Sequence, residues 1–126
     1  MTHTNDPYNL QRFVEAQAPI YHQVTEELRQ GSKRSHWMWF IFPQIAGLGS
    51  SPTAVHYAIT STDEAAAYLN HPILGPRLRE CTTLVNQLQH RSIDQIFGYP
   101  DNLKFHSSIT LFAHATPDNQ VFLNAL

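Results

Sequence analysis

The chain has 126 residues, of which 42% are hydrophobic and 14% are charged, and its formal net charge is −2 at pH 7. A chain of this length can bury roughly two-thirds of the surface that it exposes when unfolded, so we expect one domain over residues 1–126. Nonspecific affinity for nucleic acid comes from clustered Lys and Arg, and the chain has no long basic run. Duplex nucleic acid is therefore excluded as an expected partner.

The longest apolar run, residues 37–43, is too short to cross a bilayer, and the N-terminus lacks the basic and apolar regions of a signal peptide. The single cysteine, Cys81, cannot form an intramolecular disulfide and falls on an apolar helical face, so we expect it to be buried. These features predict a cytoplasmic protein with no membrane association.

The first helical pattern begins at Asn5-Asp6-Pro7, where an Asx side chain can cap free amides and Pro can occupy the first helical position. Pro19 interrupts the pattern, because its ring clashes with the preceding turn; we expect a kink near Ala16 or two short helices. Apolar residues recur at helical spacing up to a stop at Gly31: Leu10, Phe13, Val14, Tyr21, Val24 and Leu28.

Further helices follow along the chain. Ser61 and Glu64 have the spacing of a capping box, and His71-Pro72 should end the helix that they begin. After a corner predicted at Gly75-Pro76, one helical face carries Leu74, Leu78, Cys81, Val85 and Leu88. Residues 103–115 predict another helix, with Ile109, Phe112 and Ala113 inward, and Thr116-Pro117 should start the last one.

No stretch shows sustained period-two alternation, the pattern of a half-exposed strand, except possibly residues 37–42. Because those six residues are all apolar, periodicity cannot assign them to a helix or a strand. The sequence therefore predicts an all-α, compact single-domain multihelical bundle of five to seven helices, with an irregular aromatic-rich segment and a Gly-Ser loop. Aromatic side chains bury about 150–250 Å² each, so we expect most of residues 37–42 in the core. Such an anchor would hold the polar residues on either side of it in a fixed geometry.

The polar residues on either side of residues 37–42 form the candidate site. Glycines allow successive amides to converge on an anion, and Ser50 or Ser51 would cap a helix that begins at Pro52. His36 is the candidate catalytic residue, because histidine exchanges protons near neutral pH. The candidate ligand-binding residues are Lys33, Arg34, Ser35, Gln44, Gly47, Gly49, Ser50, Ser51 and His106.

The pattern predicts a small anionic or phosphate-bearing, nucleotide-like ligand, although a plain connecting turn also explains the glycines, since neither the P-loop nor the dinucleotide pattern is present. In an enzyme, Lys33 or Arg34 would neutralise phosphate, the turn would donate amides and His36 would move a proton. The rival class is a noncatalytic interaction module or homo-oligomer that uses an exposed apolar face. A third is single-stranded nucleic acid stacked on Trp37 or Trp39.

The sequence names no cofactor and does not decide between an enzyme and a binding protein. Eight histidines are present, but none is spaced with a third ligand as a metal site requires, and HExxH is absent, so no metal is expected. Nucleophile-elbow, paired-carboxylate and Cys–His patterns are also missing. Arg77 and Arg79 are expected on a solvated helix face.

Five segments are distinctive: DPYNLQRFVEAQ from Asp6, KRSHWMWFIFPQIAGLGSS from Lys33, HYAI, EAAAYLNHPILGPRL and DQIFGYPDNLKFHSSITLF. They resemble a bacterial family of unknown function that is sometimes mislabelled calpastatin, and the resemblance covers nearly the whole chain from Asp6 onward. The stretch SHWMWFIFPQ is the most specific. The resemblance implies a compact, mostly helical fold without an established activity, and it does not imply protease inhibition. Members of that family usually continue past the last helix expected in this sequence. The resemblance therefore implies that a final helical segment is missing after Leu126.

Overall fold

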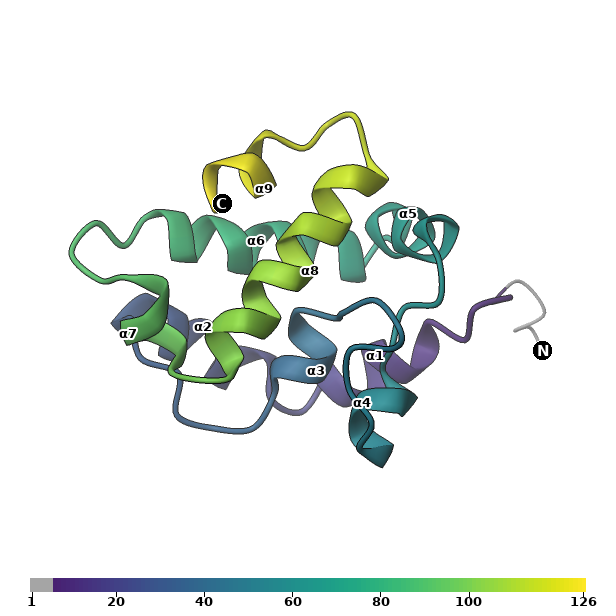
Figure 1. Cartoon of the computed structure of the whole chain (residues 1–126), viewed down its shortest axis with the longest axis horizontal. Helices are drawn as coiled ribbons and strands as arrows, with labels where there is room; N and C mark the ends of the chain where they lie inside the picture. Colours follow the sequence, from purple (N-terminus) through teal and green to yellow (C-terminus); the bar gives the residue numbers. More distant parts are fainter. Residues whose placement is uncertain (1–5) are drawn as a thin grey trace.

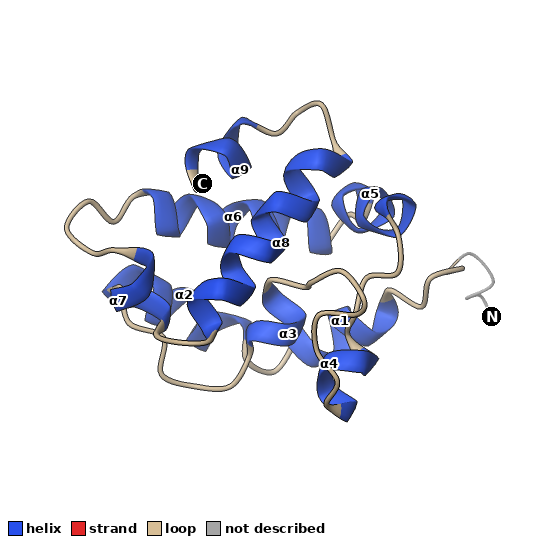
Figure 2. Cartoon of the chain, viewed as in Figure 1, coloured by secondary structure: helices blue, strands red, loops and turns tan. Residues whose placement is uncertain are grey.

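The computed structural model describes residues 6–126, and within them the chain forms nine helices and no strand (Figure 2). The helices are α1 (Gln11–Gln17), α2 (Tyr21–Gln30), α3 (Met38–Ile41), α4 (Pro52–His56), α5 (Thr62–Asn70), α6 (Leu74–Asn86), α7 (Ile93–Phe97), α8 (Asp101–Ala115) and α9 (Gln120–Asn124). The all-α class is confirmed. The number of helices exceeds the five to seven predicted, because α3 and α7 have only four and five residues, too few to show periodicity.

The start of α1 differs from the prediction. Asn5 lies outside the described residues, Pro7 precedes the helix, and the first helical residue is Gln11. Asp6 still serves the helix start, because its carboxylate accepts hydrogen bonds from the amides of Leu10 at 2.7 Å and Gln11 at 3.0 Å. Of the two alternatives for Pro19, two short helices is the correct one. The predicted stop of α2 is confirmed at Gly31, which has a left-handed conformation with φ 73°.

Two prolines, Pro76 and Pro117, were assigned wrongly. Gly75-Pro76 is no corner, because both residues lie in the first turn of α6, where proline loses no helical hydrogen bond. Thr116-Pro117 does not start the last helix, which begins at Gln120. The hydroxyl of Thr116 instead accepts a hydrogen bond from the amide of Asp118 at 3.3 Å, within the turn after α8.

Helix α8 runs diagonally across the molecule and contacts α3, α5, α7 and α9 (Figure 1). Helix α6 lies behind it and contacts α2, α5 and α9. The short helices α3 and α4 lie beneath α8 in this view, next to α1. The segment between residues 33 and 60, which carries most of the predicted site, therefore lies on the side of the molecule bounded by α1 and α8.

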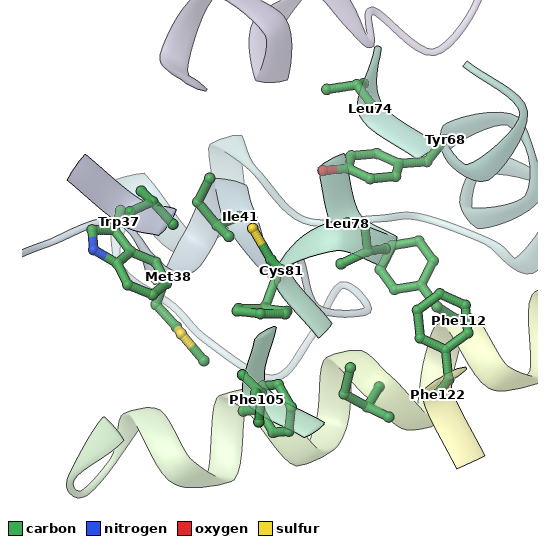
Figure 3. Packing of buried hydrophobic residues seen from close by; sticks show 14 of the residues in the cluster. Trp37, Met38, Ile41, Tyr68, Leu74, Leu78, Cys81, Phe105, Phe112 and Phe122 are labelled. Carbon is green, nitrogen blue, oxygen red and sulfur yellow. The ribbon is translucent and has the colours of Figure 1, made fainter. Parts of the chain in front are cut away.

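The aromatic segment is mostly core, as predicted. Trp37, Met38, Ile41 and Phe42 are buried, whereas Trp39 and Phe40 are only half-buried. The ring of Phe42 packs edge-on against that of Phe105 in α8, with 4.9 Å between the ring centroids. Figure 3 shows Trp37 and Met38 at one end of the packed cluster, Phe112 and Phe122 at the other, and Cys81 between them.

A buried carboxylate fixes the chain that leads into this segment. Glu27 on α2 is 6% exposed, and among the described residues no cation pairs with it. Its Oε1 accepts hydrogen bonds from the amides of Arg34 at 2.7 Å and Ser35 at 3.2 Å, and from the indole Nε1 of Trp37 at 2.9 Å. Its Oε2 accepts from the Ser35 hydroxyl at 2.6 Å and the Gln23 amide at 3.1 Å. Five neutral donor groups therefore hold one anion.

These donors decide the charge of Glu27. Burial by itself raises the pKa, but the hydrogen bonds from Ser35, Arg34, Trp37 and Gln23 outweigh burial and lower the pKa from 4.5 to about 2. The group is therefore ionised at neutral pH, and residues 34–37 wrap around an anion that the chain itself supplies.

Replacement of Glu27 by Ala should lower the free energy of unfolding by about 3 kcal/mol or more, because each buried donor left without an acceptor costs about 1–3 kcal/mol. Urea denaturation measures the loss. The control is Glu15→Ala, an exposed position on α1 where we expect a change within about 0.5 kcal/mol. A loss for Glu27→Ala no larger than that of the control would contradict the role given to this carboxylate.

The same group predicts how stability depends on pH. Because the folded pKa lies below the unfolded one, the contribution of Glu27 is fully present above about pH 4.5 and is lost as the pH falls through about 2. The difference in unfolding free energy between the wild type and Glu27→Gln should therefore be constant near neutral pH and shrink steadily in acid. Urea titrations of both proteins over this range test it, and a difference that is unchanged in acid would argue against the pKa assignment.

Candidate functional site

Residues 44–60 form a loop that carries α4 and is closed at its base by backbone hydrogen bonds. Ile45 and Ile59 form an isolated parallel β-bridge, in which the amide of Ile59 donates to the carbonyl of Gln44 and the amide of Ala46 donates to the carbonyl of Ile59, both at 2.8 Å. Ile59 is fully buried. The bridge therefore fixes both ends of the loop against the core.

The two glycines of the loop give it its shape. Gly47 has φ 99°, a conformation that L side chains rarely adopt. A Cβ on Gly49 would lie 2.8 Å from the Cβ of Ala54, so this position leaves no room for a side chain. Of the two serines predicted as a cap, Ser51 is the one that caps α4, and its hydroxyl accepts from the amide of Ala54 at 3.1 Å.

Two adjoining hollows lie against this loop, and both are lined by Trp39, Gln44, Gly49 and Ala54. The inner hollow, the more enclosed one, has a volume of about 210 Å³ and is also lined by Ile45, Ala46, Gly47, Val55, Tyr57, Ala58 and Thr60. The outer hollow has a volume of about 430 Å³ and is also lined by Leu48, Ser50, Ser51, Pro100, Leu103, Lys104 and Ser107. Small-ligand sites usually occupy about 300–1,000 Å³, so the two hollows together have a suitable size.

One carboxylate is shared by two lysines beside the outer hollow. The Nζ of Lys33 lies 2.7 Å from Oδ2 of Asp101, and the Nζ of Lys104 lies 3.6 Å from Oδ1. The two ammonium groups and the one carboxylate together carry a net charge of +1. Lys33 is nearly buried and also donates to the carbonyl of Ser35 at 2.6 Å, whereas Lys104 is more exposed and lies 4.8 Å from the ring centroid of Trp39. Lys104 is therefore the cation that faces the hollow.

The structure brings together only part of the predicted site. The residues that line the hollows are Gln44, Gly47, Gly49, Ser50 and Ser51. The residues that line neither hollow are Lys33, Arg34, Ser35, His36 and His106. The backbone of Arg34 and the side chain of Ser35 are directed at Glu27, and His36 and His106 are exposed. The glycine-serine turn therefore meets α8 rather than the basic end.

The lining side chains that had not been assigned to the candidate site include Trp39, Lys104 and Ser107. Lys104 and Ser107 are three residues apart in α8, so they share one helical face, and this spacing was visible in the sequence. Trp39 turns outward because the buried positions of α3 are taken by Met38 and Ile41, which are three residues apart. The contact of α8 with the loop was not encoded in any local pattern.

A second polar cluster lies between α2 and α6. The hydroxyl of Tyr21 donates to Glu80, and the thiol of Cys81 donates to Tyr21 at 3.8 Å. Burial raises the pKa of Cys81 to about 12, so the buried thiol predicted from the sequence is confirmed and carries no nucleophilic thiolate. Arg77 was expected in solvent, but it is half-buried, stacks over Tyr21 at 4.6 Å and donates to Gln17 at 3.3 Å. The cluster is a packed structural network.

Other hollows have cations that are already engaged. Arg12 borders one of about 420 Å³, but its guanidinium donates to the carbonyls of Tyr8, Asn9, His56 and Ala58 and to the carboxylate of Glu64. Glu64 also accepts from Thr60, so only the Ser61 half of the predicted capping box forms. Arg91 borders a hollow of about 260 Å³ and donates to the carbonyls of Gly31 and Gln95.

Metal-binding clusters and membrane-spanning helices are not found in residues 6–126. In that part of the chain, no three His, Cys, Asp or Glu side chains are grouped so that they could hold a metal ion. None of the helices formed there is both long and apolar enough to cross a bilayer.

Comparisons with known proteins agree with this fold. The crystal structure at 1.38 Å of the conserved hypothetical protein Rv1873 from Mycobacterium tuberculosis is similar to this chain, with 65% sequence identity and a TM-score of 0.95; the match covers 96% of this chain and 86% of that one. No curated protein matches. The family model described as "Protein of unknown function (DUF1810)" matches residues 7–126. This chain therefore belongs to that family.

Proposed function

We propose that the protein binds a small anionic ligand in the two hollows beside Trp39, with the negative group of the ligand at Lys104. The observation that carries the proposal is the sharing of Asp101 by two lysines, which leaves one positive charge at the edge of a hollow. Lys33 contributes indirectly, because it continues to neutralise Asp101 when Lys104 turns toward a ligand.

The loop supplies further donors. Among the described residues, the backbone amides of residues 47–50 have no backbone acceptor. The hydroxyls of Ser50 and Ser107 border the outer hollow, and that of Ser51 accepts from a helix amide while its own proton stays available. Ammonium, hydroxyl and amide donors are the groups that bind phosphate or carboxylate.

The proposal is one of binding and assigns no reaction. His36, the candidate proton-transfer residue, borders neither hollow, and the Cys81 thiol is buried in the other cluster. We also propose a cytoplasmic location, because the one cysteine is a free thiol, as is common in reducing compartments.

Titration with inorganic phosphate and with ribose 5-phosphate, followed by NMR of the backbone amides, tests the site. We expect the amides of residues 47–51 to shift, and Lys104→Gln to weaken binding about tenfold or more, because hydrogen bonds to charged groups contribute about 1.5–3 kcal/mol. Arg34→Gln is the matched control, since this exposed cation borders neither hollow, and it should bind as the wild type does. Unmoved loop amides, or an equal loss in both variants, would refute the proposal.

A second candidate function is self-association through the apolar rim of the same hollows. Four side chains there are strongly exposed: Leu48 at 58%, Val55 at 63%, Tyr99 at 81% and Leu103 at 54%. Leu48 and Leu103 line the outer hollow, Val55 lines the inner one, and Tyr99 adjoins Pro100 at the outer one. Clusters of exposed apolar side chains mark interaction surfaces. We propose a second copy of the chain as the partner.

Sedimentation at increasing protein concentration tests this candidate. We expect a dimer that Leu103→Glu dissociates, because a carboxylate cannot be buried in an apolar interface without a partner. Leu123→Glu is the control, since Leu123 is comparably exposed at 46% but lies on α9, away from the rim. A wild type that stays monomeric at millimolar concentration, or a dimer that both variants weaken alike, would count against the rim as the interface.

A further inference from the structure

The inner and outer hollows offer different chemistry to a single ligand. The inner hollow is lined by the aromatic rings of Trp39 and Tyr57 and contains no charged side chain. The outer hollow carries Lys104 and serine hydroxyls. A ligand that fills both hollows would therefore have an uncharged planar end and an anionic end.

Gln44 gives the inner hollow a means of recognising the planar end. Its side chain borders both hollows and makes no hydrogen bond with another described residue, while its carbonyl is held at 2.8 Å by the amide of Ile59. A carboxamide on a fixed backbone offers a donor and an acceptor side by side, the pair that matches the N6 and N7 edge of adenine. Trp39 beside it offers a ring on which a base can stack.

The position of Lys104 indicates which end of the ligand each hollow would bind. Its ammonium lies 4.8 Å from the ring centroid of Trp39 and borders only the outer hollow. The Trp39 surface on the outer side is therefore occupied by a cation, and the surface in the inner hollow is left for a base. The two hollows adjoin, since Gln44 and Gly49 border both, so the sugar of such a ligand would lie where the hollows meet.

We infer that the ligand is an adenine nucleotide, with the base against Trp39 and Gln44 in the inner hollow and the phosphate at Lys104 in the outer one. This inference rests on the proposed function, since it names the ligand class of the same site. It assigns Gln44 to base recognition and Lys104 to phosphate binding.

Calorimetric titration of the whole chain with AMP, adenosine, ribose 5-phosphate and inorganic phosphate tests the inference. We expect AMP to bind about tenfold or more tightly than ribose 5-phosphate, because stacking on an aromatic ring contributes about 1–3 kcal/mol per base. In NMR spectra, AMP and adenosine should move the indole N–H of Trp39, and ribose 5-phosphate should not.

The outcomes separate this inference from the proposed function. Equal affinities for AMP and ribose 5-phosphate would overturn the inference and leave the anion site in place. No binding of any phosphate-bearing probe would overturn both, and so would adenosine binding as tightly as AMP, because the phosphate would then contribute nothing at Lys104.

Gln44→Leu gives a second test. We expect this substitution to weaken the binding of AMP about tenfold and to leave the affinity for ribose 5-phosphate unchanged. The edge of the base loses its hydrogen-bond partner, whereas the phosphate keeps its own. Gln30→Leu, an exposed position at the end of α2, is the matched control and should change neither affinity. Equal weakening of both ligands by Gln44→Leu would assign Gln44 a structural role and overturn its part in base recognition. If this variant does not fold, the ligand comparison on the wild-type chain decides alone.

Discussion

The geometry of the whole site depends on one buried anion, Glu27, with which no cation pairs among residues 6–126. An isolated buried carboxylate is strongly unfavourable unless hydrogen bonds replace its lost water, and Glu27 obtains them from the backbone and side chains of residues 34–37 and from Gln23. This requirement holds the segment against α2 and places the indole of Trp37 in the core. The orientation of α3 follows from that contact, and with it the outward position of Trp39 at the two hollows.

Residues 33–35, at the basic end of the aromatic segment, have the pattern of an anion-binding site, but the anions that they bind are carboxylates of the chain itself. The amides of Arg34 and Ser35 and the Ser35 hydroxyl bind Glu27, and the ammonium of Lys33 binds Asp101. Because Asp101 is already neutralised by Lys33, Lys104 is left with a weaker contact at 3.6 Å. The positive charge of this region is thus exposed on α8, across the outer hollow from the glycine-serine turn.

The long periodic helices could be predicted from sequence, because α2, α6 and α8 each repeat apolar residues over at least ten positions. The one-turn helices α3 and α7 could not be predicted, and Pro76 was assigned wrongly because a proline fits either a turn or the first turn of a helix. The loop half of the site could be predicted because Gly47 and Ser51 have local roles. Its partner on α8 could not, because Lys104 reaches the loop only through tertiary packing.

The two proposed functions use one surface, so they are thermodynamically coupled. Leu103 precedes Lys104 on α8, and Leu48 precedes Gly49 in the loop, so the apolar rim and the proposed ligand site share the same two segments. A second copy seated on Leu48 and Leu103 would cover the mouth of the outer hollow. Any effect of the ligand on self-association then equals the effect of self-association on ligand affinity. A ligand that needs the open mouth would favour the monomer, and one enclosed by the partner would favour the dimer.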